Sequence, residues 1–597
     1  MRRLAAAMLF LPLAAYAAAP AEVADALMRG DTPAARALIE QHADVNVRQA
    51  DGATALHWAV YHSDKEMVDL LLHAGADPKA ANREGSTPLW LASINGDVVI
   101  LDALLKAGAD ANEHLPLGRT PLMAAARTGN VDAIKVLLDH GAQVNVKEAL
   151  RGTTPLMWAA DEGHAAAIQL LIQHGADFRA QSNPAERGRG PALGKANDPR
   201  KAVAAQGAAL AAGKPLGLED LAALRGDNNG IGGNRAGGAR GVAGRGGRAG
   251  RGGARGAGGD QGFDQNDDAA AAAFGFRNRP APKDGGGLTA LVYAVRANDL
   301  DSVKALLAAG ADINQVTAYG WSPLLVATQN RFYRLGVYLI EHGANVNLTN
   351  KGAWTPLYLA TDNRNIESGD YPVRKPDMDH LEFIKILLDH GADVNARMKD
   401  STETRTVFTN QWLDENGATA FLRASQSGDL VLMKLLLEHG ADPKIDTVLH
   451  VTALQVAAGI GWVEGITYEW SPQATYDAVK MLLDLGLDVN AQADTGRTAL
   501  HGAAHKGRTD VIQLLADHGA KLDVRDYGNT DNRGGKLAVH TWEPVDYADG
   551  LVRVGVQSAI AHPEAGLLLR KLMTQAGLQA PPVGRTLESI CITEACE

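Results

Sequence analysis

The sequence lacks the marks of a membrane-spanning protein and of the common catalytic classes. After Leu13 no stretch reaches the roughly 18 uninterrupted apolar residues of a membrane-spanning helix. No Gly-x-Ser-x-Gly, His-Glu-x-x-His, phosphate-binding loop or dinucleotide fingerprint occurs. The net charge of −11 is mild for 597 residues and does not indicate a class of partner. We therefore expect no membrane span, no enzyme, no cofactor and no metal site.

The N-terminus has the features of a secretory signal peptide. Two arginines precede an apolar run at 4–13, and the small-x-small sequence Ala15-Tyr-Ala17 follows. This pattern predicts a signal peptide at 1–17. The alternative, a buried first helix, fits less well because the repeat pattern described below begins only near Glu22. The sequence thus predicts an exported protein, periplasmic if the host has an outer membrane and secreted otherwise.

Cysteine is almost absent, and the two cysteines, Cys591 and Cys596, lie close together in the C-terminal tail. An even pair in an exported chain predicts one local disulfide. Because closing so short a loop stabilises little through chain entropy, we expect the bond to pin the tail. A redox or metal-binding role is the alternative, although two thiols supply only half a zinc site.

A repeated phrase is the most abundant feature of the sequence. Thr-Pro-Leu-x or a close variant recurs at spacings of 33, 33, 34, 135, 33, 33, 64, 33 and 46 residues. Roughly 25 residues after each start comes Gly-Ala-Asp-x-Asn or a variant of it, so the two phrases keep one register and indicate a repeated supersecondary unit. The first phrase starts at Thr54, Thr87, Thr120, Thr154, Thr289, Ser322, Thr355, Thr419, Thr452 and Thr498.

Each part of the unit has a local physical reason. Thr120 can cap a helix while Pro121 takes the first helical position, where its missing N–H costs nothing. The short helix predicted at 122–129 ends in glycine, and a second helix is predicted at 132–140 with an apolar stripe. Gly141 supplies the left-handed residue that ends the second helix. The unit is therefore helix, turn, helix and hairpin.

This unit resembles the ankyrin repeat, most closely at 54–59 (Thr-Ala-Leu-His-Trp-Ala) and 498–503 (Thr-Ala-Leu-His-Gly-Ala). The resemblance covers 22–183 and 287–529 well and 537–578 poorly. It implies an all-α repeat solenoid and says almost nothing about a ligand. It also implies that the histidine within each of the two phrases braces neighbouring hairpins through hydrogen bonds.

Interruptions of the period predict the organisation of the chain. The 135-residue spacing contains 102 extra residues, and 225–259 holds 16 glycines and 7 arginines, so we expect a disordered loop there. One continuous stack with this loop extruded is favoured over two separate arrays. The predicted divisions are a signal peptide at 1–17, N-terminal repeats at 18–183 beginning with a cap, the Gly/Arg-rich loop at 184–286, C-terminal repeats at 287–529 with inserts near 366–379, 399–415 and 462–473, and a degenerate capping repeat with the tail at 530–597.

Histidine is abundant at one repeat position, just before the glycine that ends the second helix. There the imidazole faces the last carbonyls and the negative end of the helix dipole, which predicts a structural role rather than a ladder of metal ligands. These residues are His140, His174, His342, His390, His439 and His518. His42 stands where glycine normally ends the helix, which fits a frayed N-terminal cap.

Aromatic residues provide the candidate binding site. Trp321 and Trp354 stand 33 residues apart, each immediately before its phrase, and we expect both rings to be exposed on adjacent hairpins. Exposed aromatic residues are enriched at interface hot spots. The alternative for the aromatic residues of the inserts is that they anchor their own loops, and Trp58, Trp90 and Trp158 are interpreted as packing residues. The predicted partner-binding residues are Trp321, Trp354, Trp412, Trp462 and Trp470.

The functional prediction is a non-enzymatic exported scaffold that binds an unidentified protein partner. Its contacts would lie on the concave hairpin face and the C-terminal inserts. One alternative is a polyanion or envelope-surface binder that uses the Arg/Gly loop, although this loop lacks the interleaved aromatic residues of nucleic-acid-binding segments, and no nucleic acid partner is expected. A second alternative is an accessory subunit of an exported enzyme or redox complex.

Overall fold

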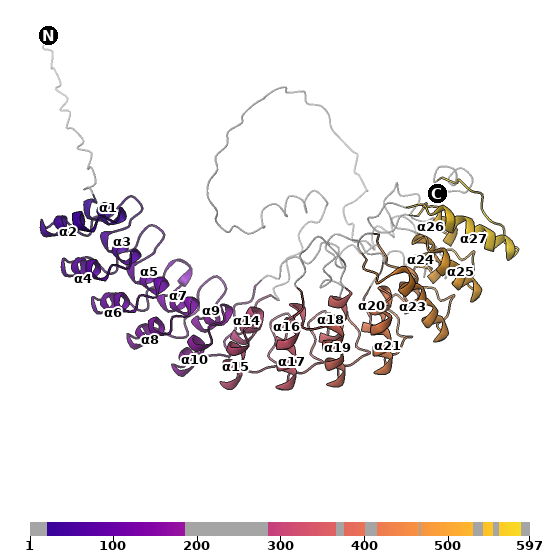
Figure 1. Cartoon of the computed structure of the whole chain (residues 1–597), viewed down its shortest axis with the longest axis horizontal. Coiled ribbons are helices and arrows are strands. Elements are labelled where there is room, and N and C mark those ends of the chain that lie inside the picture. The colour runs from indigo at the N-terminus through magenta and orange to yellow at the C-terminus, as the bar shows by residue number, and fades with distance from the viewer. Residues whose placement is uncertain are drawn as a thin grey trace, which may run out of the picture. The chain divides into compact units, whose positions relative to one another are not determined.

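The computed structural model describes residues 21–185, 285–365, 375–399, 413, 415–464, 467–528, 541–552 and 560–586 (Figure 1). The predicted signal peptide, residues 186–284 of the predicted Gly/Arg-rich loop, Trp412 and both cysteines lie outside the described residues. Within them the chain forms 24 α-helices and no strands, which confirms the all-α repeat fold.

The caps predicted from the phrase form as expected. Helix α7 (Pro121–Thr128) begins after Thr120, whose Oγ1 accepts a hydrogen bond from the Met123 N–H at 3.4 Å. It ends at Gly129, which adopts φ 73° in the left-handed region that glycine tolerates. Helix α8 (Val131–Asp139) follows, and its buried Ile134 faces the core. The predicted boundaries are therefore confirmed to within a residue or two at this repeat.

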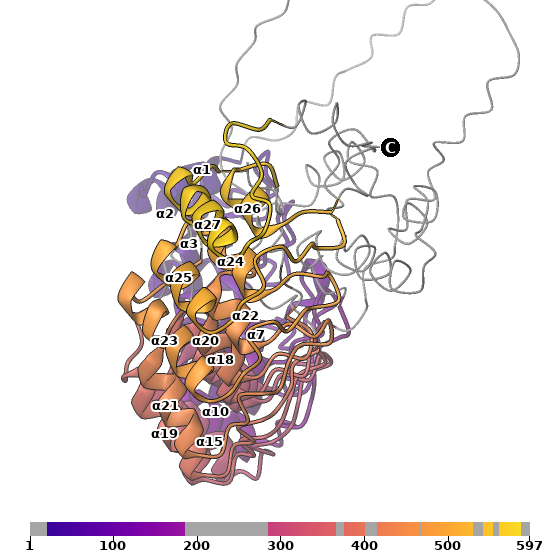
Figure 2. The same ribbon diagram turned by 90° about the vertical axis from the view of Figure 1, so that its right-hand side faces the viewer.

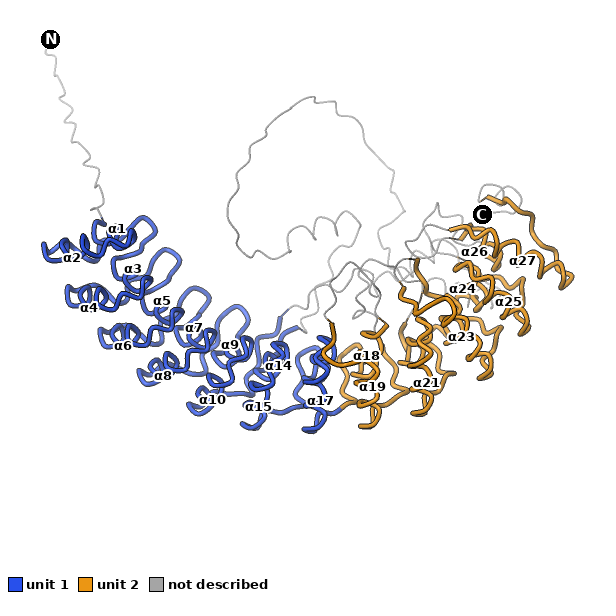
Figure 3. The backbone as a smooth tube through the Cα atoms, viewed as in Figure 1, with its two compact units in different colours: residues 1–185, 284–345 blue, residues 186–283, 346–597 orange. Residues whose placement is uncertain are grey.

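The chain divides into two compact units, and the first comprises 1–185 and 284–345 (Figure 3). Each repeat of unit 1 contributes a first and a second helix, and the first helices pack against one another along the stack. The first helices are α1 (Glu22–Met28), α3 (Ala55–Tyr61), α5 (Pro88–Asn95), α7, α9 (Pro155–Asp161), α14 (Ala290–Ala297) and α16 (Pro323–Gln329). The second helices are α2 (Thr32–Glu40), α4 (Lys65–His73), α6 (Val98–Lys106), α8, α10 (Ala165–Gln173), α15 (Leu300–Ala308) and α17 (Tyr333–Glu341).

Unit 2 contains the described residues from 346 onward and is built in the same way. Figure 2 shows its second helices in one layer, its first helices in the next and the finger loops beyond them. The finger loops are the hairpins that connect one repeat to the next. The first helices are α18 (Pro356–Arg364), α20 (Ala420–Gln426), α22 (Ala453–Ala458), α24 (Ala499–His505) and α26 (Pro544–Ala548). The second helices are α19 (His380–Asp389), α21 (Leu430–Glu438), α23 (Pro472–Asp484), α25 (Thr509–Asp517) and α27 (Pro563–Gln575).

The asparagine of the second phrase joins each repeat to the next. The Asn46 Nδ2 donates to the carbonyl of Gly75 at 2.9 Å, and its Oδ1 accepts from the Asp77 N–H at 2.8 Å. One amide thus satisfies a carbonyl and an N–H beyond the end of the neighbouring helix, groups that the helix itself leaves unpaired. The same pair of bonds recurs at Asn112, Asn145 and Asn314 in unit 1 and at Asn347, Asn395 and Asn490 in unit 2.

The repeats on either side of the long insertion are direct neighbours in unit 1. Helix α9 packs on α14 and α10 packs on α15. Ala185 and Gly285 exchange two backbone hydrogen bonds of 2.9 Å, and the Ser182 N–H donates to the carbonyl of Leu288 at 2.9 Å. The insertion therefore leaves and re-enters at the tip of one finger loop, and the stack continues through it. The compact units divide at 345/346 instead.

Candidate interaction surfaces

Trp354 does not stand in water, so the prediction of an exposed ring there is wrong. Its side chain is 0% exposed and lies edge-on to the ring of Tyr358, with centroids 4.9 Å apart. The Oδ1 of Asn350 accepts hydrogen bonds from the N–H groups of Gly352 (2.9 Å) and Trp354 (3.1 Å). This turn folds the finger loop back on itself and directs the residue before the cap toward α18.

The other tryptophans at this repeat position behave in a related way. Trp321 is half-buried, and its backbone N–H donates to the Thr317 Oγ1 at 3.0 Å. Trp542, which precedes the cap of α26, is 3% exposed, and its N–H donates to the Asp526 Oδ1 at 2.9 Å. Trp321 belongs to unit 1 and Trp354 to unit 2.

Trp470 anchors the insert that precedes α23. Its Nε1 donates to the Asn365 Oδ1 at 3.0 Å, and its backbone N–H donates to the carbonyl of Ser427 at 3.2 Å. Its ring, on a residue that is 42% exposed, lies 4.4 Å from the guanidinium of Arg364. Trp462, half-buried, lies edge-on to His505 with centroids 6.1 Å apart. These contacts favour the alternative in which the aromatic residues hold their own insert against the first helices.

A buried charge network lies beneath Trp470. The Arg364 Nε and Nη2 donate to the two carboxylate oxygens of Asp429 at 2.7 and 3.2 Å, and both side chains are almost fully buried. The same carboxylate accepts from the Asn365 Nδ2 at 3.2 Å and from the Leu432 N–H at the start of α21. Because every oxygen of this carboxylate has a partner, the cost of burying the pair is offset.

Arg423 makes a second link between α20 and α18. Its Nε donates to the Asp362 Oδ1 at 2.9 Å, its Nη1 to the Ser427 Oγ at 3.1 Å and its Nη2 to the carbonyl of Asn365 at 2.7 Å. Most other repeats carry an apolar or small residue at this position, four after the cap. The side chains of Arg364 and Arg423 are therefore engaged in contacts between neighbouring repeats.

Lys506, which follows α24, contacts residues near both ends of the same insert. Its ammonium contacts the carboxylate of Glu469 and lies 5.6 Å from the ring of Trp462. Burial lowers the pKa of Lys506, while the contact with Glu469 favours the charged form. Glu469 also accepts from the Thr475 Oγ1 at 2.9 Å. The lysine is thus an ion-pair anchor whose charge is used within the chain.

The two histidines of the repeat phrase brace neighbouring finger loops, as predicted. The Nδ1 of His501 accepts from the Thr498 N–H at 3.0 Å, and its Nε2 donates to the carbonyl of Trp542 at 3.2 Å. His57 makes the same contacts with Thr54 and with the carbonyl of Ser86. Burial lowers the pKa of His501 to about 3 and lowers that of His57 as well.

The histidines before the terminating glycines serve as caps. In four of them the Nδ1 donates to the carbonyl four residues earlier, at 2.7 to 2.9 Å, which confirms the structural role predicted for this position. These are His342, His390, His439 and His518. His42 adopts φ 61°, the left-handed conformation that glycine has in the other repeats. Among the described residues no group of three or more His, Cys, Asp or Glu side chains is placed to hold a metal ion.

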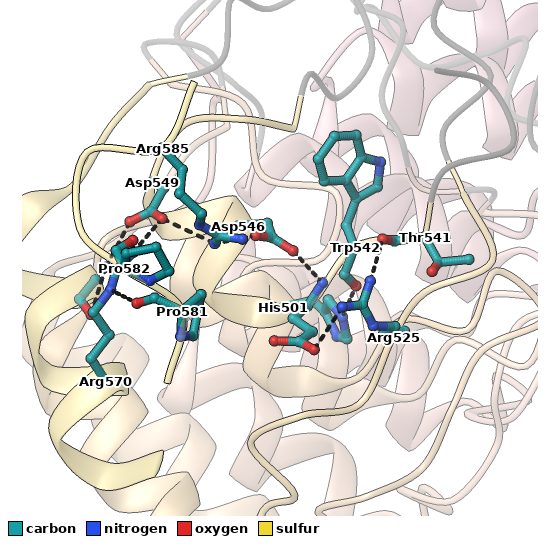
Figure 4. Close-up of polar contacts among 12 residues, drawn as sticks. His501, Arg525, Thr541, Trp542, Asp546, Asp549, Arg570, Pro581, Pro582 and Arg585 are labelled. Atoms are coloured by element: carbon teal, nitrogen blue, oxygen red, sulfur yellow. Dashed lines mark hydrogen bonds and ion pairs between the residues drawn. The ribbon is translucent and has the colours of Figure 1, made fainter. Parts of the chain in front are cut away.

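The last repeat is closed by two arginines (Figure 4). Arg570 makes a bidentate pair with Asp549, with distances of 2.9 and 2.6 Å, and donates to the carbonyls of Pro581 and Pro582. Arg585 pairs with Asp546 and Asp549. These bonds hold the segment after α27 against the end of unit 2, so the cluster serves as a C-terminal cap.

An exposed apolar row crosses the first helices of unit 1. It occupies the seventh position after each cap residue: Met28 is 45% exposed, Tyr61 61% and Ile94 45%. In the next three repeats the same position carries Arg127, Asp161 and Arg296. Two ion pairs neutralise these charges, Arg127–Glu162 at 3.1 Å and Arg296–Asp161 at 3.4 Å. We call Met28, Tyr61 and Ile94 the apolar ridge.

Comparison with known proteins identifies the architecture. A family model of three ankyrin repeats matches residues 23–114, 89–182, 291–398 and 471–537, and a model of one ankyrin repeat matches 416–448. The chain belongs to the ankyrin repeat family. Ankyrin repeats generally mediate protein–protein interactions, and proteins of this family are typically binding scaffolds.

A curated relative of the ankyrin-repeat chain is a transient receptor potential cation channel subfamily A member 1 homolog from Caenorhabditis elegans. It is 27% identical over 166 residues, which cover 25% of this chain and 12% of the relative. The chain therefore spans only a small part of that protein. Within the described residues no helix is long and apolar enough to cross a membrane.

Sequence reasoning missed the apolar ridge of this ankyrin-repeat protein, although a signal for it exists. Counting seven residues from each cap places methionine, tyrosine and isoleucine at one position in the first three repeats. Trp90, interpreted as a packing residue, is indeed buried with Leu115 and Ala124, whereas Trp58 and Trp158 are half-exposed. The apolar ridge lies in unit 1.

Proposed function

We propose that this ankyrin-repeat protein is a non-enzymatic scaffold that binds a protein partner through the first helices of unit 1. The observation that carries the proposal is the apolar ridge, three large apolar side chains at one position of successive repeats, each 45% or more exposed. Large apolar side chains left in water have an unfavourable free energy of hydration, which association with a partner removes. The insert aromatic residues Trp462 and Trp470 are already engaged within unit 2.

A site-specific photo-cross-linking residue at position 61 tests this proposal. The expected result is a covalent adduct with one protein species after irradiation of whole cells that produce the variant. The matched control is a variant with the photo-cross-linking residue at position 99. Val99 is 51% exposed on the second helix α6 of the same unit. Adducts at position 99 but not at 61 would place the interface on the other face of the stack.

We further propose that the scaffold acts outside the cytoplasm, in the periplasm of a host with an outer membrane. The support is the arrangement of two arginines, an apolar run and Ala15-Tyr-Ala17 at the N-terminus. Intact-mass measurement of protein purified from the native host should show a chain that begins at or near Ala18. A soluble chain that retains Met1 and fractionates with cytoplasmic markers contradicts this proposal.

A further inference from the structure

Two buried histidines lie where the last repeat of unit 2 packs on the repeat before it. His501 and His505 belong to α24, which packs on α26, and they are 0% and 2% exposed. The His501 Nε2 donates to the carbonyl of Trp542, two residues before α26 (Figure 4). Both imidazole rings lie edge-on to the ring of Tyr547 on α26, with centroids 5.2 and 6.4 Å apart. The contact between the two repeats therefore includes two imidazoles that are shielded from water.

The folded chain holds both rings in the neutral form. The His501 Nδ1 accepts from the Thr498 N–H, so a proton on this nitrogen would remove a hydrogen bond. Burial is the main cause that lowers the pKa of each histidine to about 3, and the positive charge of Arg497 acts in the same direction. For His505 the neighbouring His562, which precedes α27, also lowers the pKa. Protonation of either ring therefore opposes the contact between the two repeats.

The carboxylates around the two rings are already paired with other cations. The Arg497 Nε donates to the Tyr547 hydroxyl at 2.8 Å, and this hydroxyl donates to the Asp526 Oδ2 at 2.5 Å. The ion pairs in this region are Asp526 with Arg497, Glu543 with Arg525, Asp546 with Arg585 and Glu469 with Lys506. A proton on either ring would therefore add a positive charge to a buried region whose acids are already neutralised, which is costly.

The last repeat can respond to this charge without the rest of the array. In a repeat protein each unit contacts only its neighbours, so a terminal unit can open while the others stay folded. Helix α26 packs on α24, and α27 packs on α25. Detachment of α26 and α27 would return both imidazoles to water, where they bind protons near their ordinary pKa of 6.5. Acid therefore favours the detached state.

We propose that the last repeat, α26 and α27, is an acid-released element: protonation of His501 and His505 detaches it from α24 and α25 while the preceding repeats of unit 2 stay stacked. Those repeats use amides at the same positions. Helix α22 carries Gln455 at the position of His501, and α20 carries Gln426 at the position of His505; both glutamines are buried. The release needs no partner, so it stands apart from the proposed binding function.

Hydrogen–deuterium exchange of the full chain, followed by mass spectrometry at pH 7.5 and pH 5, tests the release. Protection factors corrected for the pH dependence of intrinsic exchange report the opening of each helix. Each histidine whose pKa changes from about 3 to 6.5 on release should raise the opening constant about 30-fold at pH 5. The amides of α26 and α27 should therefore lose far more protection on acidification than those of α20 and α21.

Glutamine replacements locate the response. The double variant His501→Gln with His505→Gln uses the side chain that unit 2 already buries at the equivalent positions of α22 and α20, and it should keep α26 and α27 protected at pH 5. Each single variant should recover about 30-fold of the lost protection. His518→Gln is the matched control, because His518 lies exposed at the end of α25 in the same repeat. The control should release the last repeat as the wild type does.

Several results would each overturn the proposal. One is unchanged protection of α26 and α27 in the wild type at pH 5, and another is an equal loss in α20 and α21, which would show that unit 2 unfolds as a whole. A loss in the double variant as large as in the wild type, or its suppression in the control, would place the acid response elsewhere. Circular dichroism at pH 7.5 shows whether the double variant folds; if it does not, the wild type and the two single variants decide.

Discussion

His501 is one residue through which acid should destabilise unit 2, and a single substitution tests this. Its Nδ1 accepts from the Thr498 N–H and its Nε2 donates to the carbonyl of Trp542, so the neutral ring is required. A proton on Nδ1 would remove the acceptor and place a charge in a fully buried site. In the preceding repeat Gln455 fills the same role without a titrating group: its Oε1 accepts from the Thr452 N–H at 2.8 Å and its Nε2 donates to the carbonyl of Arg497 at 2.9 Å.

The sign and size of the effect follow from proton linkage. Burial lowers the pKa of His501 to about 3, whereas the unfolded chain binds the same proton near its ordinary value of 6.5. Below pH 6.5 the unfolded state therefore holds a proton that the folded state does not, so stability is fully present at neutral pH and falls as pH drops from 6.5 toward 3. At pH 5 the loss is about 2 kcal/mol, at 1.36 kcal/mol per pH unit.

The substitution His501→Gln should keep both hydrogen bonds and remove this pH dependence. Urea unfolding of the wild type and the variant, followed by tryptophan fluorescence at pH 7.5 and pH 5, measures the difference. We expect stabilities within about 1 kcal/mol at pH 7.5 and a variant that loses about 2 kcal/mol less on acidification. His501→Ala, which removes both hydrogen bonds, should have a lower free energy of unfolding than the wild type at both pH values. If His501→Gln loses as much stability as the wild type, the acid sensitivity arises elsewhere, and the reasoning from the His501 contacts is wrong.

Three further predictions concern other parts of the chain. Burial raises the pKa of Glu113 to about 7, so the free energy of unfolding falls as pH rises from 4.5 through 7. Glu113→Gln keeps the Thr87 contact and should stabilise the protein by about 2–3 kcal/mol in thermal unfolding at pH 8. A variant no more stable than the wild type at pH 8 contradicts this. Trp354→Ala should lower the free energy of unfolding by about 3–5 kcal/mol because removing a fully buried ring leaves a cavity, whereas Trp470→Ala should lower it clearly less. Equal shifts of the denaturant midpoint in the two variants would contradict this difference in burial. Proteolytic cutting within 186–284 should leave two fragments that co-elute on a sizing column, because α9 packs on α14, and their separation would refute the continuous stack in unit 1.

Local features of the fold were predictable because they depend on residues close in sequence. Thr120 caps α7 through a residue three positions away, and Gly129 ends the helix through its own backbone conformation. The Thr or Ser of the repeated phrase caps the first helix in the same way in most of the other repeats. The bracing contacts of His57 and His501 were also predictable, through the resemblance to the ankyrin repeat, because the same histidine position recurs in the phrase.

The candidate site was predicted far less well. Trp354 and Trp321 occupy one sequence position, yet one ring is fully buried and the other half-buried. The difference depends on the finger-loop turn and on which side chain, such as Tyr358, the adjoining helix presents. Trp470 likewise reaches Asn365, 105 residues earlier, a contact that no local pattern encodes.

By itself the sequence determined the repeating unit, its caps and its stacked all-α architecture, because each follows from short-range hydrogen bonding and from apolar faces that only a neighbouring repeat can cover. The tertiary structure alone decided which side chains remain free to bind. An equivalent position carries an exposed apolar group in Met28, Tyr61 and Ile94 and an internally paired charge in Arg127. Exposure and pairing are properties of neighbours in space, and the packing of one helix against the next determines them.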